Sequence, residues 1–398
     1  MHQKLNFSTE ILPYMESNLV INSVPFFLRK YSESTESQLV SVLRSGFLTS
    51  GKVGMYVEDL LESYFEIAGA ALMNSWTNGA VVALSCLDVG EGDEVIVPAM
   101  TFVATASSVK CVNAEPILCD VCPKSGNVTW EFIQAKLSNR TKAIFVVHMY
   151  GLMVDVKLIR DSLDNIGRQD VSIIEDAAHC FEGEFDNYKP GRYSKCAIFS
   201  FYATKNISCG EGGAVISSDQ EFIEACKVSR LHGMTGTAYD RYTSKIFQHY
   251  DVESFGYKAN LPDLLACMLP DQITACDSVL VSRESAAQTY INSLQTLIER
   301  GQLRVQKYSS CRVKHARHLF PIFINNQPRD AIIDKLNIAG IGVAVNFRSL
   351  TDLTEYSSIS CPNAEKWGSE CISLPFFPAI SEEQIRYVVK KLSIALTI

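Results

Sequence analysis

Short apolar runs alternate with segments of helical spacing through the first half of the chain, and this alternation limits the possible folds more than any other feature. The runs are rich in Val and Ile, which is typical of strands buried on both faces. Between them, apolar residues recur every three or four positions, as in amphipathic helices. This pattern predicts a mostly parallel sheet with helices on both faces. We expect strands at residues 70–73, 94–98, 116–119, 143–148, 171–174 and 214–217. We expect helices at residues 80–89, 100–111, 130–137, 156–166 and 220–231.

The pattern changes after residue 255. Residues 255–263 read FGYKANLPD and open a long helix that extends toward residue 299. Beyond it we expect strands at 318–324 and 342–347 and helices at 329–339 and 381–396. This predicts a smaller α+β unit, so we divide the chain into a large domain, residues 1–255, and a small domain, residues 256–398.

Two other segments are expected to lack regular structure. Helical spacing over residues 32–64 is interrupted at 45–54, which read SGFLTSGKVG, because the glycines favour a loop. Residues 232–251 are aromatic and polar without a period, so we expect an ordered loop there.

The composition is that of a soluble globular protein and argues against several classes of function. A chain of 398 residues suffices for two domains, and a net charge of −8 without a basic block argues against nucleic acid as a partner. Among 13 cysteines only Cys119 and Cys122 are closely spaced, and no second pair completes a zinc site, so we expect no metal. The odd cysteine count favours reduced thiols in the cytoplasm. We expect neither a secretory signal nor a membrane span.

Polar clusters follow the expected strands, where ligands bind in parallel sheets. They read NSWTNG, MTF, HMYG and EDAAH, and the last contains Asp176. Further along, Lys205 stands in SFYATKNISCGEGG, residues 200–213. A buried amine has a lowered pKa and is nucleophilic, and an ionised acid keeps a pyridine nitrogen protonated. The Asp176–Lys205 pair therefore indicates a site for pyridoxal 5′-phosphate (PLP), although a helix N-cap is the simpler alternative for Asp176.

The other requirements of PLP have weaker candidates. Thr77 and Asn78 lie where a strand turns into a helix, so they either hold a phosphate or cap the helix. Phe102 either stacks on the cofactor ring or belongs to the core. Ser200 is a further phosphate candidate, and His179 is either a neighbour of the ring or a buried histidine with a structural role.

The motifs, taken in order, resemble the nucleotide-sugar aminotransferases of the DegT/StrS family, within the fold-type I PLP enzymes. The resemblance covers nearly the whole chain. It is carried by LRSGFLTSGKV, NSWT, GEGDEVIVPAMTFVATA, VVHMYG, IIEDAAHCFEG, SFYATKNISCGEGGAV, RLHGM, GYKANLPD and GIGVAVNF…PNAEKWGSECISLPFFP. It implies an α/β fold with a mostly parallel seven-stranded sheet between helices in the large domain, followed by a smaller C-terminal α+β domain.

When the family's functional residues are matched to this sequence by position, the resemblance implies a role for most of the candidates. Lys205 becomes the lysine that forms the aldimine with PLP, and Asp176 the partner of the pyridine nitrogen. Phe102 matches the stacking residue, and His179 matches a position beside the ring. Three residues match phosphate-binding positions: Thr77, Asn78 and Ser200.

The resemblance also implies a homodimer with two composite sites. Asn260 matches an asparagine that, in relatives, reaches the phosphate in the neighbouring subunit, although it could instead cap the long helix. Two departures stand out. Trp76 lies where many relatives have glycine, and Asn346 lies where many have histidine near the sugar. The identity of the substrate is therefore left open.

The function implied is a transaminase that moves the amino group of L-glutamate, leaving 2-oxoglutarate, onto a nucleotide-diphosphate-linked keto sugar. RLHGM and GYKANLPD favour a 4-keto-6-deoxy sugar over a 3-keto sugar, for cell-surface polysaccharide such as lipopolysaccharide or another glycoconjugate. A PLP-dependent sugar dehydratase of the same family has histidine at the lysine position, so Lys205 disfavours it. A PLP-binding regulator without turnover would not require the Asp176–Lys205 pair.

Overall fold

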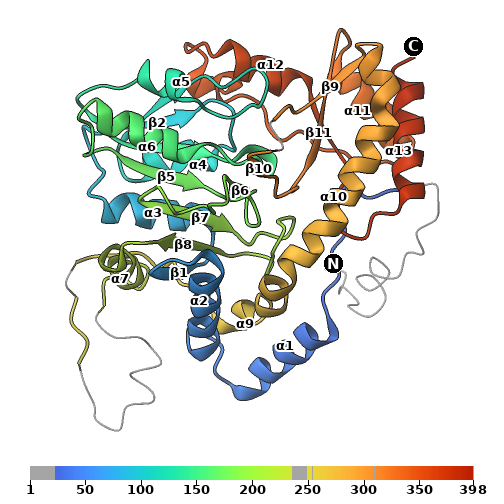
Figure 1. The fold of residues 1–398 in the computed structure, drawn as a ribbon. Helices are drawn as coiled ribbons and strands as arrows, with labels where there is room; N and C mark the ends of the chain where they lie inside the picture. The colour runs from blue at the N-terminus through green and yellow to red at the C-terminus, as the bar shows by residue number, and fades with distance from the viewer. Residues whose placement is uncertain (1–22, 235–248, 253, 309–310, 398) are drawn as a thin grey trace, which may run out of the picture.

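The computed structural model describes residues 23–234, 249–252, 254–308 and 311–397, with a seven-stranded sheet at its centre (Figure 1). The strand order is β1-β8-β7-β5-β4-β2-β3, and β8 alone runs antiparallel to its neighbours. The strands are β1 (Gly69–Met73), β2 (Glu94–Pro98), β3 (Glu115–Cys119), β4 (Thr141–Val147), β5 (Ser172–Asp176), β7 (Cys196–Ser200) and β8 (Gly213–Ser217). Nearly all their residues are buried, which explains the continuous apolar runs. The predicted sheet is confirmed.

Successive residues of a strand enter different layers of helices. In β4, Ala143 and Phe145 belong to the core cluster that contains α3, α4 and α7, whereas Ile144 and Val146 pack with α6 on the other face. Near β1 and β8 that second face is covered by α2. The helices of this part are α1 (Glu33–Ser45), α2 (Lys52–Phe65), α3 (Trp76–Cys86), α4 (Ala104–Cys111), α5 (Trp130–Gln134), η3 (Met149–Gly151), α6 (Val156–Asn165) and α7 (Gln220–Ser229). The three layers leave the strand ends open for a site.

A second sheet has three antiparallel strands in the order β12-β11-β9 and packs against the C-terminal helices. The helix α10 connects the two sheets, with Ile273 in the core of the large sheet and Tyr290 in that of the small one (Figure 1). The elements are β6 (Glu184–Phe185), α9 (Asp263–Ala266), α10 (Pro270–Glu299), β9 (Leu303–Val305), β10 (Val313–Lys314), β11 (Phe320–Ile324), α11 (Arg329–Ile338), η4 (Leu350–Asp352), η5 (Thr354–Tyr356), α12 (Pro362–Glu370), β12 (Cys371–Leu374) and α13 (Glu382–Ala395). The division at residues 255 and 256 stays a prediction.

Three expectations need correction. The strand at 342–347 is wrong, because this segment makes only one isolated bridge, Ala344↔Ser373, and the residue before it makes another to a different partner, Val24↔Ile341, instead of a ladder. The long helix is two helices, since Pro270 has no N–H with which to continue α9 and instead begins α10. The loop at 45–54 ends early, at the start of α2. Residues 235–248 of the expected loop lie outside the described residues.

The segment Asp263–Glu299 is long and apolar enough to span a membrane by length and composition, with a mean hydropathy of 1.4 in its most apolar window. A core helix of a globular protein meets the same criterion. Ile273, Tyr290 and Leu294 of α10 lie in the two core clusters, so this helix has packing partners inside the protein.

Candidate active site

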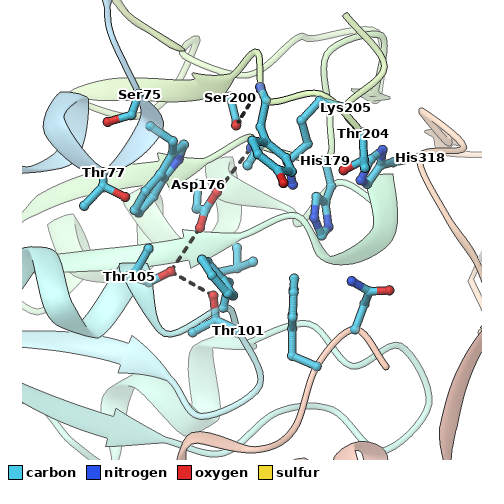
Figure 2. Close-up of a pocket in the computed structure, with 18 of the residues that line it drawn as sticks. Ser75, Thr77, Thr101, Thr105, Asp176, His179, Ser200, Thr204, Lys205 and His318 are labelled. Carbon is cyan, nitrogen blue, oxygen red and sulfur yellow. Dashed lines mark hydrogen bonds between the residues drawn. The ribbon is translucent and has the colours of Figure 1, made fainter. Parts of the chain in front are cut away.

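The carboxyl ends of the central strands and the start of α3 enclose a cavity of about 550 Å³ (Figure 2). Three of the four predicted polar clusters, NSWTNG, MTF and EDAAH, contribute to its wall, whereas HMYG does not. Six of the predicted site residues line it: Thr77, Phe102, Asp176, His179, Ser200 and Lys205. The other two, Asn78 and Asn260, do not.

Asp176 is the last residue of β5, and both of its carboxylate oxygens accept hydrogen bonds. The backbone N–H of Ala178 donates to Oδ1 at 3.2 Å, and the hydroxyl of Thr105 donates to Oδ2 at 3.1 Å (Figure 2). Thr101 lies 2.8 Å from the Thr105 hydroxyl. Burial raises the pKa of Asp176, whereas the Ala178 N–H, the charge of Lys205 and Thr105 oppose this rise. The side chain is therefore an oriented acid on the cavity wall.

Lys205 lies on the loop that follows β7, and its amide donates to the carbonyl of Tyr202 at 2.9 Å. Its amine faces the cavity, and burial lowers the pKa of this amine to about 8, although Asp176 opposes the shift. With this pKa roughly a tenth of the molecules carry the neutral amine at pH 7, against roughly one in two thousand for an ordinary lysine. Burial therefore raises the fraction of Lys205 in the neutral form that nucleophilic attack on a carbonyl requires.

His179 is held as a neutral imidazole. The backbone N–H of Tyr150 donates to its Nδ1 at 3.3 Å, so the ring proton must lie on Nε2. Burial and the nearby charge of Lys205 hold the pKa of His179 well below its usual range. The ring stacks on Phe347 with centroids 5.7 Å apart, and the centroid of His318 lies at 4.3 Å. His179 therefore enters the cavity wall as a hydrogen-bond donor.

The N-terminus of α3 supplies amides at one end of the cavity. Ser75 is the N-cap, and its hydroxyl accepts from the amide of Asn78 at 3.1 Å. The Asn78 side chain donates to Asn74 at 2.7 Å, which accounts for its absence from the cavity. The amides of Trp76 and Thr77, in the first turn of α3, have no acceptor within the helix. They lie at the positive end of the helix dipole, where a phosphate binds well.

Gly213 allows β8 to lie close to the start of α3. A Cβ atom there would lie 2.8 Å from the Ser75 carbonyl carbon and 2.8 Å from the Trp76 nitrogen, too near for any side chain. The glycine after Glu211 and Gly212 therefore lets β8 touch the start of α3. The glycine cluster of the sequence has a packing reason at this position.

Asn260 occupies a different place. It bridges to Met73 at the end of β1, and its side chain donates to Ser50 at 2.6 Å and accepts from Lys258 at 2.6 Å. Its amide is thus engaged within its own chain, beneath the loop between α1 and α2. Asn260 makes no contribution to the cavity of its own chain.

Several residues that line the cavity were not singled out as site residues. Thr105 is one helical turn from Thr101, a signal that the sequence does contain. His318 and Phe26 come from distant segments that only the tertiary structure brings here. Phe102 is 55% exposed at the rim, with its ring centroid 5.4 Å from that of Phe347.

The geometry fits PLP on the side chains alone. An acid, a lysine amine with a lowered pKa, an imidazole donor and a helix N-terminus all face one cavity large enough for a phosphorylated pyridine ring. Among the described residues, no group of three His, Cys, Asp or Glu side chains is placed to hold a metal ion. The fold and the cavity define a PLP-dependent enzyme of the aminotransferase class.

The comparisons with known proteins agree with this class. The sequence profile of the DegT/DnrJ/EryC1/StrS aminotransferase family matches residues 30–393, and the chain belongs to this family. The uncharacterized protein MJ1066 of Methanocaldococcus jannaschii is 32% identical over 377 residues, which are 92% of this chain and 96% of that protein. The predicted family, fold and cofactor are confirmed.

Solved structures are similar over almost the whole chain. The putative sugar aminotransferase Spr1654 from Streptococcus pneumoniae in its PMP form has a TM-score of 0.86 and 25% identity, covering 94% of this chain and 99% of that one. Its PLP form gives 0.85. S. venezuelae DesV, in complex with a ketimine intermediate, has a TM-score of 0.81 and 26% identity, covering 92% and 94%. The protein is a PLP-dependent aminotransferase.

Proposed function

We propose that the protein transfers the amino group of L-glutamate to a nucleotide-diphosphate-linked keto sugar, with 2-oxoglutarate as the other product. The observation that carries this proposal is the convergence of Asp176, His179 and Lys205 on one cavity. The relatives named as sugar aminotransferases support a sugar as the acceptor. Within this class we propose a 4-keto-6-deoxy sugar, with a 3-keto sugar as the alternative, for polysaccharide or other glycoconjugate synthesis.

Each side chain has a role that follows from its position. When bound, PLP supplies an electron-withdrawing ring that stabilises negative charge at the carbon beside the amine. Lys205 would hold the cofactor through its amine, and the same amine, when free, would carry the proton at that carbon. Asp176 would keep the pyridine nitrogen protonated, and His179 would offer its Nε2 proton as a hydrogen-bond donor to the cofactor. Phe102 covers the ring from the rim.

We propose that the cofactor phosphate binds at the end of the cavity that the N-terminus of α3 forms. The amides of Trp76 and Thr77 and the Thr77 hydroxyl are the donors that the helix N-terminus offers. The hydroxyl of Ser200 lines the same cavity and accepts from the Tyr202 amide at 3.3 Å, which leaves its proton for a phosphate oxygen. Asn78 does not line the cavity but stabilises this end of it, because its amide donates to Ser75 and its side chain donates to Asn74.

We propose a homodimer in which Asn260 serves the partner's site. Exposed apolar side chains lie on α1, α2 and the loop between them: Val40, Leu43, Leu48, Met55 and Tyr56. Exposed apolar side chains gathered on neighbouring elements of the chain support an interface here. Ser50, which accepts from Asn260, belongs to this loop, so docking a second copy here would bring Asn260 and Lys258 near another chain.

We also propose a cytoplasmic location. The 13 cysteines all lie in the part of the chain that the structure describes, where none forms a disulfide, and most of them are buried. Free thiols in this number are typical of a reducing compartment.

Two other functions have less support. A sugar dehydratase of this family would have histidine in place of Lys205. A regulator that binds PLP without turnover would not need a buried acid with an oriented hydrogen-bond donor at each oxygen, as Asp176 has.

A panel of nucleotide-linked 3-keto and 4-keto sugars, each incubated with glutamate and the holoenzyme, tests the proposal. We expect 2-oxoglutarate and one amino sugar, whose aminated carbon NMR identifies. Conversion of a sugar without consumption of glutamate would indicate the dehydratase. Glutamate consumption with no sugar accepted would contradict the proposed acceptor.

A further inference from the structure

The loop that carries Lys205 is held from behind by one guanidinium group. One amino group of Arg29 donates to the carbonyls of Lys205 and of Asn206, the latter at 3.1 Å. The other amino group donates to Oε1 of Gln272, on α10, at 2.6 Å. Arg29 therefore fixes the two peptide groups that follow the Cα atom of Lys205.

Gln272 and Asn206 extend this arrangement to the rest of the loop. Gln272 accepts from the Ser208 amide at 3.0 Å and donates to the Ser208 carbonyl at 2.8 Å. The Asn206 side chain donates to Glu182 at 2.7 Å. The backbone from Lys205 to Ser208 is thus bound at its carbonyls, at an amide and through a side chain.

Arg29 belongs to the segment that precedes α1, and backbone hydrogen bonds hold this segment against residues 340–342. The Val24 amide donates to the Gly340 carbonyl at 2.9 Å, and the Gly342 amide donates to the Val24 carbonyl at 2.9 Å. A Cβ atom on Gly342 would lie 2.5 Å from the Phe26 nitrogen, so only glycine lets the two segments approach this closely. Phe26 lines the cavity, and Arg29 reaches behind it to the lysine loop.

A second arginine also binds backbone carbonyls, away from the cavity. Arg160 donates to the carbonyls of Val171 and Arg168 at 2.9 and 3.1 Å, and it forms an ion pair with Asp164 at 2.6 Å. In both arginines the Nε atom is buried and has no partner. Arg160 therefore serves as a control for the loss of guanidinium–carbonyl bonds at a place remote from Lys205, although its further partner is the carboxylate of Asp164 where that of Arg29 is the amide of Gln272.

We propose that Arg29 is a positioning residue for Lys205, which aims the amine at the cofactor aldehyde. The proposal rests on the role proposed above for Lys205. When the amine attacks, a C=N bond replaces the C=O bond, and the aldehyde oxygen leaves as water with the two protons of the amine. Only a ligand with an aldehyde uses this bond. Loss of Arg29 should therefore weaken binding of PLP and spare pyridoxamine phosphate (PMP), which has no aldehyde.

The test compares the dissociation constants of PLP and PMP for the cofactor-free wild type and its variants. For Arg29→Met we expect PLP to bind at least tenfold more weakly, about 1.4 kcal/mol, and PMP to bind within twofold of wild type. Arg29→Lys keeps the charge and a donor, so its PLP affinity should fall only about threefold. Arg160→Met should be less stable to heat and should bind both ligands as wild type does.

Two results would overturn the proposal. One is a folded Arg29→Met variant that binds PLP as tightly as wild type. The other is equal weakening of PLP and PMP, which would indicate general damage to the cavity. If Arg29→Met does not fold, Arg29→Lys is judged by the same ratio, and an unchanged ratio refutes the idea. Lys205→Ala is measured alongside: an unchanged preference for PLP in that variant would refute the role of Lys205 and the proposal that rests on it, whereas a lost preference there with an unchanged ratio in Arg29→Met would refute the role of Arg29 alone.

Discussion

Replacing Asp176 by asparagine removes a charge from the cavity and keeps the shape of the side chain. The Ala178 amide can still donate to the carboxamide oxygen. The Thr105 hydroxyl can turn, accept from the new NH₂ group and donate to Thr101, which lies 2.8 Å away. Each bond is retained, so we expect the free energy of unfolding to change by about 1 kcal/mol or less.

The effect on catalysis should be far larger, because asparagine cannot keep the pyridine nitrogen protonated. Two unit charges about 4 Å apart, in surroundings of intermediate polarity, attract each other by about 4 kcal/mol. Each 1.36 kcal/mol corresponds to a factor of ten in rate. We therefore expect Asp176→Asn to slow the reaction with glutamate roughly thousandfold.

The assay is the absorbance change of the bound cofactor when glutamate is mixed with the holoenzyme, with circular dichroism as the check on folding. Thr105→Val is the matched variant, because it leaves the Asp176 charge in place and removes one hydrogen bond at 3.1 Å. It should slow the reaction only about tenfold, in line with the roughly 1.5 kcal/mol at the lower end of what a hydrogen bond to a charged group contributes. An Asp176→Asn protein that reacts within tenfold of wild type would refute the reasoning.

Three further predictions concern the cofactor-free protein, cofactor binding and the dimer. In competitive acetylation Lys205 should react half-maximally near pH 8, its lowered pKa, whereas an ordinary lysine needs about pH 10. Because the amine keeps its proton to a higher pH in the unfolded chain, Lys205 lowers the stability of the folded protein fully below pH 8, and this effect fades as the pH rises above 8. Trp76 lines the cavity, so Trp76→Phe should remove most of the fluorescence quenching by PLP, whereas Trp130→Phe and Trp367→Phe should retain it. Mixed dimers of Lys205→Ala and Asn260→Ala chains should be more active than either parent, and no recovery after confirmed exchange would mean that each chain builds its own site.

The sheet could be predicted because burial on both faces leaves a direct record in the sequence. Residues 95–97 of β2 and 143–147 of β4 are unbroken apolar runs, and they are buried in the structure. The segment 342–347 also contains several apolar residues yet forms no strand, since a strand needs a neighbour along its length and this segment meets Ser373 only at a single bridge. Local composition carries no information about such partners.

The cavity residues also divide into those that the local sequence indicates and those that depend on distant segments. Asp176 and Lys205 follow strands, and strand ends meet at one edge of a parallel sheet, so the sequence order already indicated that they face each other. Phe26, Arg29 and His318 reach the site from segments remote in sequence, so no spacing rule could find them. Asn78 was expected at the phosphate, but its competing bonds to Ser75 and Asn74 became visible only in the structure.

The role of Lys205 is tested most directly by borohydride reduction of the holoenzyme, followed by digestion and mass spectrometry. Reduction makes the bond between a lysine and PLP permanent, so the peptide that gains the cofactor mass identifies the residue. We predict that this peptide contains SFYATKN with the modification on Lys205, and that Lys205→Ala yields no modified peptide. Cofactor fixed to another lysine, or bound cofactor that reduction does not fix, would contradict the role proposed for Lys205.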